Sequence, residues 1–180
     1  LMDLEEKVVK SVSRYKGEIV DVYQQTVELP DGTLANRDVV KHQDAIAILA
    51  LTADGKALFE KQWRAPVAKP TIEIPAGKVE PGEAFLETAK RELNEETGYA
   101  AGKIEKMVGF YSAPGFTDEY MTVYKATDLK PVEDKLPRDQ GENLKVFELS
   151  LSEALKAIED GKIEDAKTVL AIYHWQATTK

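Results

Sequence analysis

Hydrophobic and polar residues alternate over the N-terminal part of the chain in a way that is typical of β-strands. Residues 17–29 predict one or two strands, and residues 33–42 are expected to return as their hairpin partner after a proline-aspartate-glycine turn. Residues 45–51 are wholly apolar and predict a buried strand. Because Asp54-Gly55 follows it, residues 56–62 are expected to form a second hairpin with this strand.

The apolar residues change to a helical period after residue 84. Pro81-Gly82 predicts a turn before this helix, and Gly98 predicts its end. One apolar stripe of the helix is therefore expected to face the core, and it consists of Phe85, Leu86, Ala89 and Leu93.

Further strands and two more helices are predicted in the second half of the chain. Ser150 and Glu153 form a capping box that opens a helix ending at Gly161, and residues 165–178 predict a final helix. Trp63 is expected in the core, since it would face away from Arg64 in a strand. The order of elements predicts a mixed sheet covered by helices. The additional strands are expected at residues 103–111, 120–129 and 144–149.

Three glutamates are concentrated on one flank of the predicted helix after residue 84. Glu92, Glu95 and Glu96 occupy positions i, i+3 and i+4, so their carboxylates converge. Glu95 has Arg91 one turn back, whereas Glu92 and Glu96 have no basic residue three or four positions away. Two carboxylates about 6 Å apart repel by roughly 3 kcal/mol at an effective dielectric constant near 20. A hard divalent cation would relieve this repulsion, and Mg²⁺ suits such a site because it binds few carboxylates and retains phosphate oxygens and waters.

Length and composition narrow the class of protein. The 180 residues, 43% of them hydrophobic and 31% charged, predict one domain with a sizeable core. The sequence has no cysteine, which excludes disulfides and thiolate metal sites. It shows neither a membrane-spanning run nor a signal-peptide pattern, so we expect no membrane partner and a cytoplasmic location. The net charge of −8 argues against nucleic acid as a partner.

The three glutamates belong to a longer motif. Gly77 is followed after five residues by Glu83, after seven more by Arg91-Glu92-Leu93, and then by Glu95-Glu96 and Gly98. This pattern resembles the Nudix box, GX5EX7REUXEEXGU, and departs from it only at Tyr99, where the family usually has an aliphatic residue. The resemblance implies the Nudix fold, an α/β/α sandwich with a mixed sheet. We expect an N-terminal β element at residues 1–43 and the catalytic domain at residues 44–180.

Segments outside the box look like the ADP-ribose pyrophosphatase branch of that family. They are the N-terminal hairpins, TIEIPAGKVE, SAPGFTDE and IEDAKTVLAI, and Pro114 lies sixteen residues after Gly98, as in this branch. The resemblance implies a homodimer that hydrolyses ADP-ribose to AMP and ribose 5-phosphate with two or three Mg²⁺ ions, or Mn²⁺, per site. Two alternatives stay open. One is another nucleoside diphosphate sugar such as GDP-mannose, and the other is a regulatory module without turnover.

The resemblance also suggests which residues carry the chemistry. Glu92, Glu95, Glu96 and the carbonyl of Ala76 are expected to bind metal, with Glu92 and Glu96 as catalytic residues. The base that activates water should lie outside the box. We expect it at Glu142, with Glu133 and Asp134 as competitors.

Substrate contacts are expected at four positions. Arg64 and Glu73 match family positions that hold the diphosphate and a ribose. Arg37 is expected to reach the adenine or a phosphate, and Glu119 the terminal ribose. Structural roles are expected for both histidines, His42 and His174, and for five motif residues: Gly77, Glu83, Arg91, Gly98 and Pro114.

Overall fold

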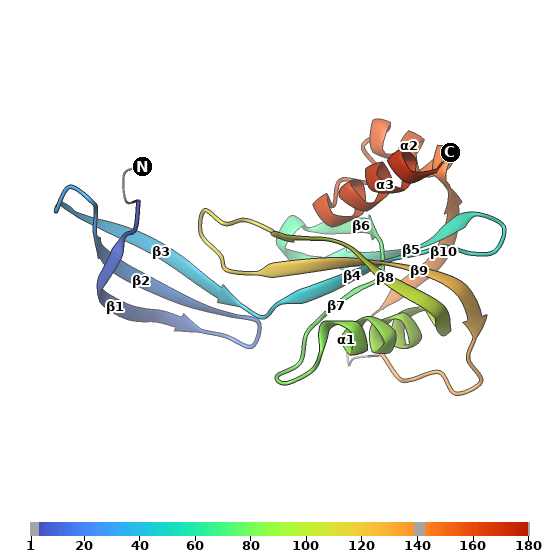
Figure 1. Cartoon of the computed structure of the whole chain (residues 1–180), viewed down its shortest axis with the longest axis horizontal. Coiled ribbons are helices and arrows are strands. Elements are labelled where there is room, and N and C mark those ends of the chain that lie inside the picture. Colours follow the sequence, from blue (N-terminus) through green and yellow to red (C-terminus); the bar gives the residue numbers. More distant parts are fainter. Residues whose placement is uncertain (1–3, 139–142, 180) are drawn as a thin grey trace. The chain divides into compact units, whose positions relative to one another are not determined.

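The structure is a computed structural model that describes residues 4–138 and 143–179. Its internal contacts divide the chain into two compact units, which are described separately (Figure 1). Unit 1 comprises Leu1–Asp44 and Phe110–Met121, and unit 2 comprises Ala45–Gly109 and Thr122–Lys180. The loop around Pro114 therefore belongs to the same unit as the N-terminal strands.

Unit 1 is built on an antiparallel three-stranded sheet in the order β1-β2-β3, formed by Lys7–Lys16, Val20–Glu28 and Leu34–His42. The turn before β3 forms as expected, because the Asp31 carboxylate accepts hydrogen bonds from the backbone and hydroxyl of Thr33. Val27 is buried, whereas β1 is exposed along nearly its whole length. This sheet therefore has little core of its own.

Unit 2 contains two sheets, with strand orders β7-β4-β9-β8 and β10-β5-β6. Strand β4 is buried at every position, as its apolar run predicts. The strands are β4 (Ala45–Ala50), β5 (Lys56–Arg64), β6 (Lys69–Glu73), β7 (Ala76–Lys78), β8 (Tyr99–Tyr111), β9 (Tyr120–Pro131) and β10 (Leu144–Ser150).

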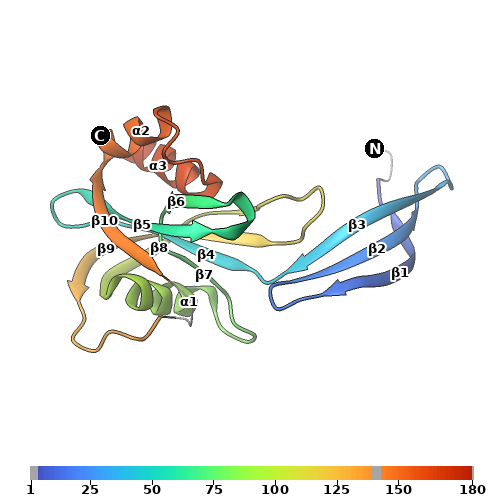
Figure 2. The same cartoon turned by 180° about the vertical axis from the view of Figure 1, so that it is seen from behind.

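Helices cover both sides of the strands of unit 2. Helix α1 (Phe85–Glu92) lies on one side, and α2 (Leu151–Glu159) and α3 (Ala166–Thr178) lie on the other (Figures 1 and 2). Ala89 and Leu93 are fully buried in a cluster with Ile46 and Ile48 of β4. The capping box of Ser150 opens α2, and Asp165 caps α3. The expected α/β architecture, with strands between helices, is confirmed.

Three expectations about local structure were wrong. Strands β4 and β5 do not form a hairpin: they lie in different sheets, and only an isolated bridge between Leu51 and Ala57 joins this region. Each strand has partners on both sides, so no edge is left for the other. Trp63 is 62% exposed, because it lies at the end of β5, beyond the covered position Phe59 on the same face.

The third wrong expectation concerns the apolar stripe of the helix that carries the glutamates. After α1 it continues as a π-helical turn, η2 (Leu93–Thr97), and ends at Gly98 with φ of 75°. Leu86 is also partly exposed, so the buried stripe is narrower than expected. An isolated π-turn widens the helix locally, and such turns are frequent at functional sites.

Candidate active site

The short strand β7 brings the backbone against the glutamate helix. A Cβ atom on Gly77 would lie 1.9 Å from Oε1 of Glu92, so a larger residue here would have to displace the Glu92 side chain. The backbone N–H of Ala76 donates a hydrogen bond of 3.0 Å to Oε2 of Glu96. The structure therefore places Ala76, Glu92 and Glu96, three of the predicted metal-binding residues, around one point of contact between β7 and the helix.

Arg91 forms ion pairs with three glutamates of the box. Its Nε and Nη2 atoms donate to Glu83 at 3.0 and 3.1 Å, and Nη1 donates to Glu92 at 2.7 Å and Glu95 at 3.1 Å. Glu83, above all, raises the pKa of Arg91, and Arg91 in turn lowers the pKa of Glu83 to about 2. Glu83 also accepts a hydrogen bond from the Thr88 hydroxyl. It therefore takes part in this network in addition to lying near the start of the helix.

The donor set of this site fits a hard divalent cation. Glu92 and Glu96 are 7% and 1% exposed, and carboxylate and carbonyl oxygens are the ligands that Mg²⁺ prefers. Because Gly77 has no side chain, the backbone of β7 lies close to the Glu92 carboxylate. Among the described residues, however, no three acidic or histidine side chains converge closely enough to hold an ion. Because Arg91 holds Glu92 and Glu95, binding an ion would require the ligands to converge further.

A second charged cluster lies where β5 and β6 meet the start of α3. Glu73 is 2% exposed and accepts two hydrogen bonds of 2.8 Å from Nε and Nη2 of Arg64. The Thr71 hydroxyl donates to it at 2.6 Å, and Lys167 forms an ion pair with it. Burial alone would raise the pKa of Glu73, but Arg64, Lys167 and Thr71 outweigh it and lower this pKa to about 2. With four donors on its two oxygens, Glu73 is arranged to hold Arg64 rather than to accept a ribose hydroxyl.

Glu60 connects the two clusters, although it was not among the residues predicted from the sequence. It is 0% exposed, lies directly opposite Glu73 in the β5–β6 register, and has Glu96 among the side chains that influence its pKa. Gln62 donates to its Oε1 at 2.6 Å, whereas its Oε2 has no partner among the described residues. Burial and the neighbouring Glu73 raise the pKa of Glu60 to about 8. The signal that could have found it is a glutamate at an inward position of an otherwise buried strand.

Lys167 was also missed, although its position is informative. A cation in the first turn of a helix is disfavoured by the helix dipole, so its presence there indicates a specific partner. That partner, Glu73, lies 94 residues away in the sequence, and no local pattern predicts this pair.

Two of the predicted substrate-binding residues belong to unit 1. Arg37 forms a bidentate ion pair with Glu6, with contacts of 2.6 and 2.9 Å. Glu119 lies 3.4 Å from Nδ1 of His42. The loop that carries Pro114 is hydrogen-bonded to β3: the Val40 N–H donates to the Phe116 carbonyl at 2.7 Å.

The predicted base, Glu142, lies outside the described residues. The segment before it is tied to the end of the glutamate helix. Arg138 and Lys135 donate to the Glu96 carbonyl at 2.9 and 3.2 Å, and the Leu136 N–H donates to the Asn94 side chain. Lys and Arg are favourable at a helix C-terminus, where the carbonyls carry partial negative charge.

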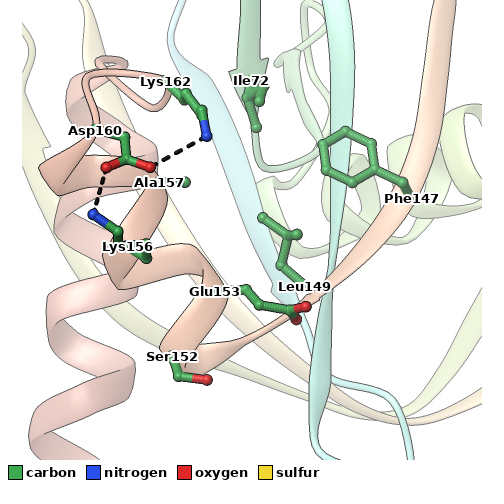
Figure 3. A pocket seen from close by; sticks show the side chains of 9 residues that line it. All are labelled: Ile72, Phe147, Leu149, Ser152, Glu153, Lys156, Ala157, Asp160 and Lys162. Carbon is green, nitrogen blue, oxygen red and sulfur yellow. Dashed lines mark hydrogen bonds and ion pairs between the residues drawn. The ribbon is translucent and has the colours of Figure 1, made fainter.

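A groove of about 410 Å³ lies elsewhere on unit 2, between α2 and the β10-β5-β6 sheet (Figure 3). Ile72, Phe147 and Leu149 are among the apolar residues that line it, and Asp160 lies between Lys156 and Lys162 at its rim. None of the predicted site residues lines this groove. Within the described residues, no helix combines the length and apolar character needed to cross a membrane.

The comparisons with known proteins identify the family of this chain. The sequence pattern of the NUDIX domain matches residues 41–171, and the chain belongs to this family. An ADP-ribose pyrophosphatase of Bacillus subtilis (strain 168) is 44% identical over 176 residues, which covers 98% of this chain and 95% of that protein. A protein of Bacillus methanolicus named methanol dehydrogenase activator is 40% identical, covering 96% and 93%. The crystal structure of an ADP compounds hydrolase matches with a TM-score of 0.85 at 20% identity, over 97% of this chain and 95% of that one, and thus shares the fold.

Proposed function

We propose that this protein is a Mg²⁺-dependent pyrophosphatase that cleaves ADP-ribose to AMP and ribose 5-phosphate. The observation that carries the proposal is the buried network in which Glu60 joins the box glutamates to the Arg64–Glu73 pair. It combines carboxylates suited to a divalent cation with a cation suited to a phosphate. The 44% identity to an ADP-ribose pyrophosphatase over nearly the whole chain supports this substrate.

Each group of residues has its own part in the proposed reaction. Glu92, Glu95, Glu96 and the Ala76 carbonyl would hold the metal, and Arg91 orients the carboxylates. Magnesium, when bound, supplies positive charge that offsets the charge of a diphosphate and of its transition state. Arg64, held by Glu73, would bind the diphosphate. Arg37 and Glu119 are proposed to contact the adenosine and the terminal ribose in a homodimer.

We propose Glu142 as the base that takes a proton from the attacking water. Because this role appears only in the transition state, Glu142→Gln should lower kcat while leaving KM within about threefold. Steady-state kinetics with ADP-ribose measure both constants. A raised KM with an unchanged kcat would make Glu142 a binding residue instead.

A substrate panel tests the function directly. ADP-ribose, GDP-mannose, NADH and ATP are compared by phosphate release after coupling to a phosphatase, and the release by the phosphatase alone is subtracted. We expect kcat/KM for ADP-ribose to exceed the others by at least about tenfold, or 1.4 kcal/mol. If GDP-mannose is hydrolysed faster, the substrate assignment fails while the metal chemistry stands.

A second candidate is a regulator of another enzyme. It is favoured by one observation, the 40% identity to the methanol dehydrogenase activator. The same panel separates the two functions, because a regulator without turnover would release no phosphate beyond that released by the phosphatase alone.

A further inference from the structure

Lys167 occupies an unusual position for a lysine. Only 8% of the residue is exposed, although lysine is almost never buried unless paired. The segment that carries it is fixed to the residue after β6 by the buried Thr168 hydroxyl, which accepts a hydrogen bond of 2.9 Å from the Ile74 N–H. Asp165 caps the helix and lies 3.0 Å from Nζ of Lys167. The backbone therefore presents this ammonium group at a defined place beside Glu73.

Lys167 and Arg64 share one carboxylate. Arg64 contacts Glu73 through Nε and Nη2, and Lys167 contacts the Oε2 atom that Nη2 also uses. On the strand opposite, Glu60 adds a further carboxyl group next to Glu73. Without Lys167, Glu73 would lose a charged partner on the buried side, and Arg64 and the Thr71 hydroxyl would be left to orient it.

Arg64 is the most exposed of the three side chains in this ion-pair network. Its side chain is 43% exposed, in contrast to 3% for Glu73 and 10% for Lys167. Its Nη1 atom has no hydrogen-bond acceptor among the described residues. A guanidinium group held along one edge presents the other edge in a fixed direction, which suits it to bind a phosphate oxygen.

We propose that Lys167 is a positioning residue for the reaction: it fixes Glu73, which in turn fixes the guanidinium of Arg64 for the diphosphate of the substrate. This inference rests on the proposed function, because it takes Arg64 as the diphosphate-binding residue. Lys167 itself touches no substrate. Its effect must therefore pass through Arg64, and that is what distinguishes it from a residue that only stabilises the fold.

A double-mutant cycle tests this route. Lys167→Met keeps an unbranched chain but removes the charge, and Arg64→Ala removes the group on which Lys167 acts. In the parent protein, Lys167→Met should lower kcat/KM for ADP-ribose by at least about tenfold. In the Arg64→Ala background, Lys167→Met should lower kcat/KM by less than about threefold, because the effects of substitutions within one ion-pair network are not additive. Equal factors in both backgrounds, or no effect in the parent, overturn the proposal.

Binding of inorganic pyrophosphate gives a second readout that does not depend on turnover. Calorimetry in Mg²⁺ buffer should show weaker binding by at least about fivefold in each single variant, and little further loss in the double variant. If the parent fails to hydrolyse ADP-ribose, the proposed function fails, and this measurement still decides the role of Lys167. An unchanged pyrophosphate affinity in either single variant overturns the role.

Two further variants control for charge and folding. Lys162→Met removes a lysine whose side chain is 65% exposed and pairs with Asp160, so it should leave both readouts unchanged. A change of the same size in Lys162→Met as in Lys167→Met overturns the proposal. If Lys167→Met does not fold, Lys167→Arg, which keeps the charge but moves it, must show the same dependence on Arg64.

Discussion

At the scale of single residues, one arginine offsets the charge of several carboxylates in the Nudix box. Arg91 contacts Glu83, Glu92 and Glu95, whereas Glu96 is held by the backbone of Ala76. The cluster therefore keeps excess negative charge in a partly buried place. Such an arrangement is costly for a fold unless a cation also binds there.

Replacing Glu96 by glutamine tests the metal site. The amide keeps the size of the side chain and can still accept from the Ala76 N–H, but it removes one charged ligand. Turnover of ADP-ribose should fall at least about a hundredfold, or 2.7 kcal/mol of barrier. Mn²⁺ binding measured by electron paramagnetic resonance should weaken in parallel.

Glu87→Gln is the matched control for this variant. Glu87 lies on the same helix, is exposed, and pairs with Lys90 at 2.8 Å. The control should retain parental turnover and Mn²⁺ affinity. Near-normal activity of Glu96→Gln at saturating Mg²⁺ would contradict the metal assignment.

Glu60 predicts how stability depends on pH. Its pKa is about 8 in the folded protein against 4.5 for the ordinary side chain. Between these values the folded state keeps a proton that the unfolded state has lost, so the free energy of unfolding falls as pH rises from about 4.5 to 8 and then levels. Glu60→Gln removes this contribution. In urea unfolding with EDTA, the variant should gain at least about 1 kcal/mol relative to the parent between pH 5 and pH 8. A constant difference over this range would show that Glu60 titrates normally.

At the scale of elements, features that depend on neighbours in the sequence were predictable and features that depend on distant partners were not. The capping box of Ser150 involves residues three positions apart, and it forms as predicted; the final predicted helix also forms, with Asp165 as its cap. The turn after β4 also forms, but turn residues specify a reversal rather than a partner strand, so the pairing of β5 with β6 and β10 was not foreseen.

The same distinction applies to the site. The spacing of Glu92, Glu95 and Glu96 is visible in the sequence, because one helix carries all three. The contacts of Glu60 and Lys167 are made across sheets and helices, and the long separation in sequence hides them. Trp63 shows a further limit: alternation predicted its face correctly, but not that this face is uncovered at the end of β5.

The close approach of β7 to α1 restricts which residues fit at position 77 of the box. An added Cβ would lie within 2.5 Å of three atoms of Glu92, so Gly77→Ala should displace this side chain and destabilise the protein by about 1–3 kcal/mol. Chemical unfolding measures the loss. Because the clash involves one side chain, Glu92→Ala should restore much of the stability in the double variant. If both variants lose stability additively, the restriction at Gly77 comes from the backbone rather than from Glu92.

At the scale of the whole molecule, unit 1 lacks the core that an independent element needs. Its three strands bury Val27, whereas large apolar side chains of the same region are exposed. A small sheet with one buried apolar residue is not expected to be stable alone. The large exposed apolar residues between residues 4 and 44 are Leu4, Val8, Val9, Tyr15, Ile19 and Leu34. We propose that a second copy of the chain covers them in a homodimer.

Sedimentation velocity and ADP-ribose hydrolysis test this last proposal together. Val8→Glu places a charge on an exposed apolar position of β1, and burying it in an interface should raise the dimer dissociation constant at least about tenfold. Ser11→Glu introduces the same charge at an exposed polar position of the same strand and should leave the dimer intact. Deletion of residues 1–40 should abolish both dimerisation and ADP-ribose binding, because Arg37 is lost with the sheet. A full-length parent that sediments as a monomer with full activity would exclude the dimer as a requirement, and the exposed residues of unit 1 would then need another partner.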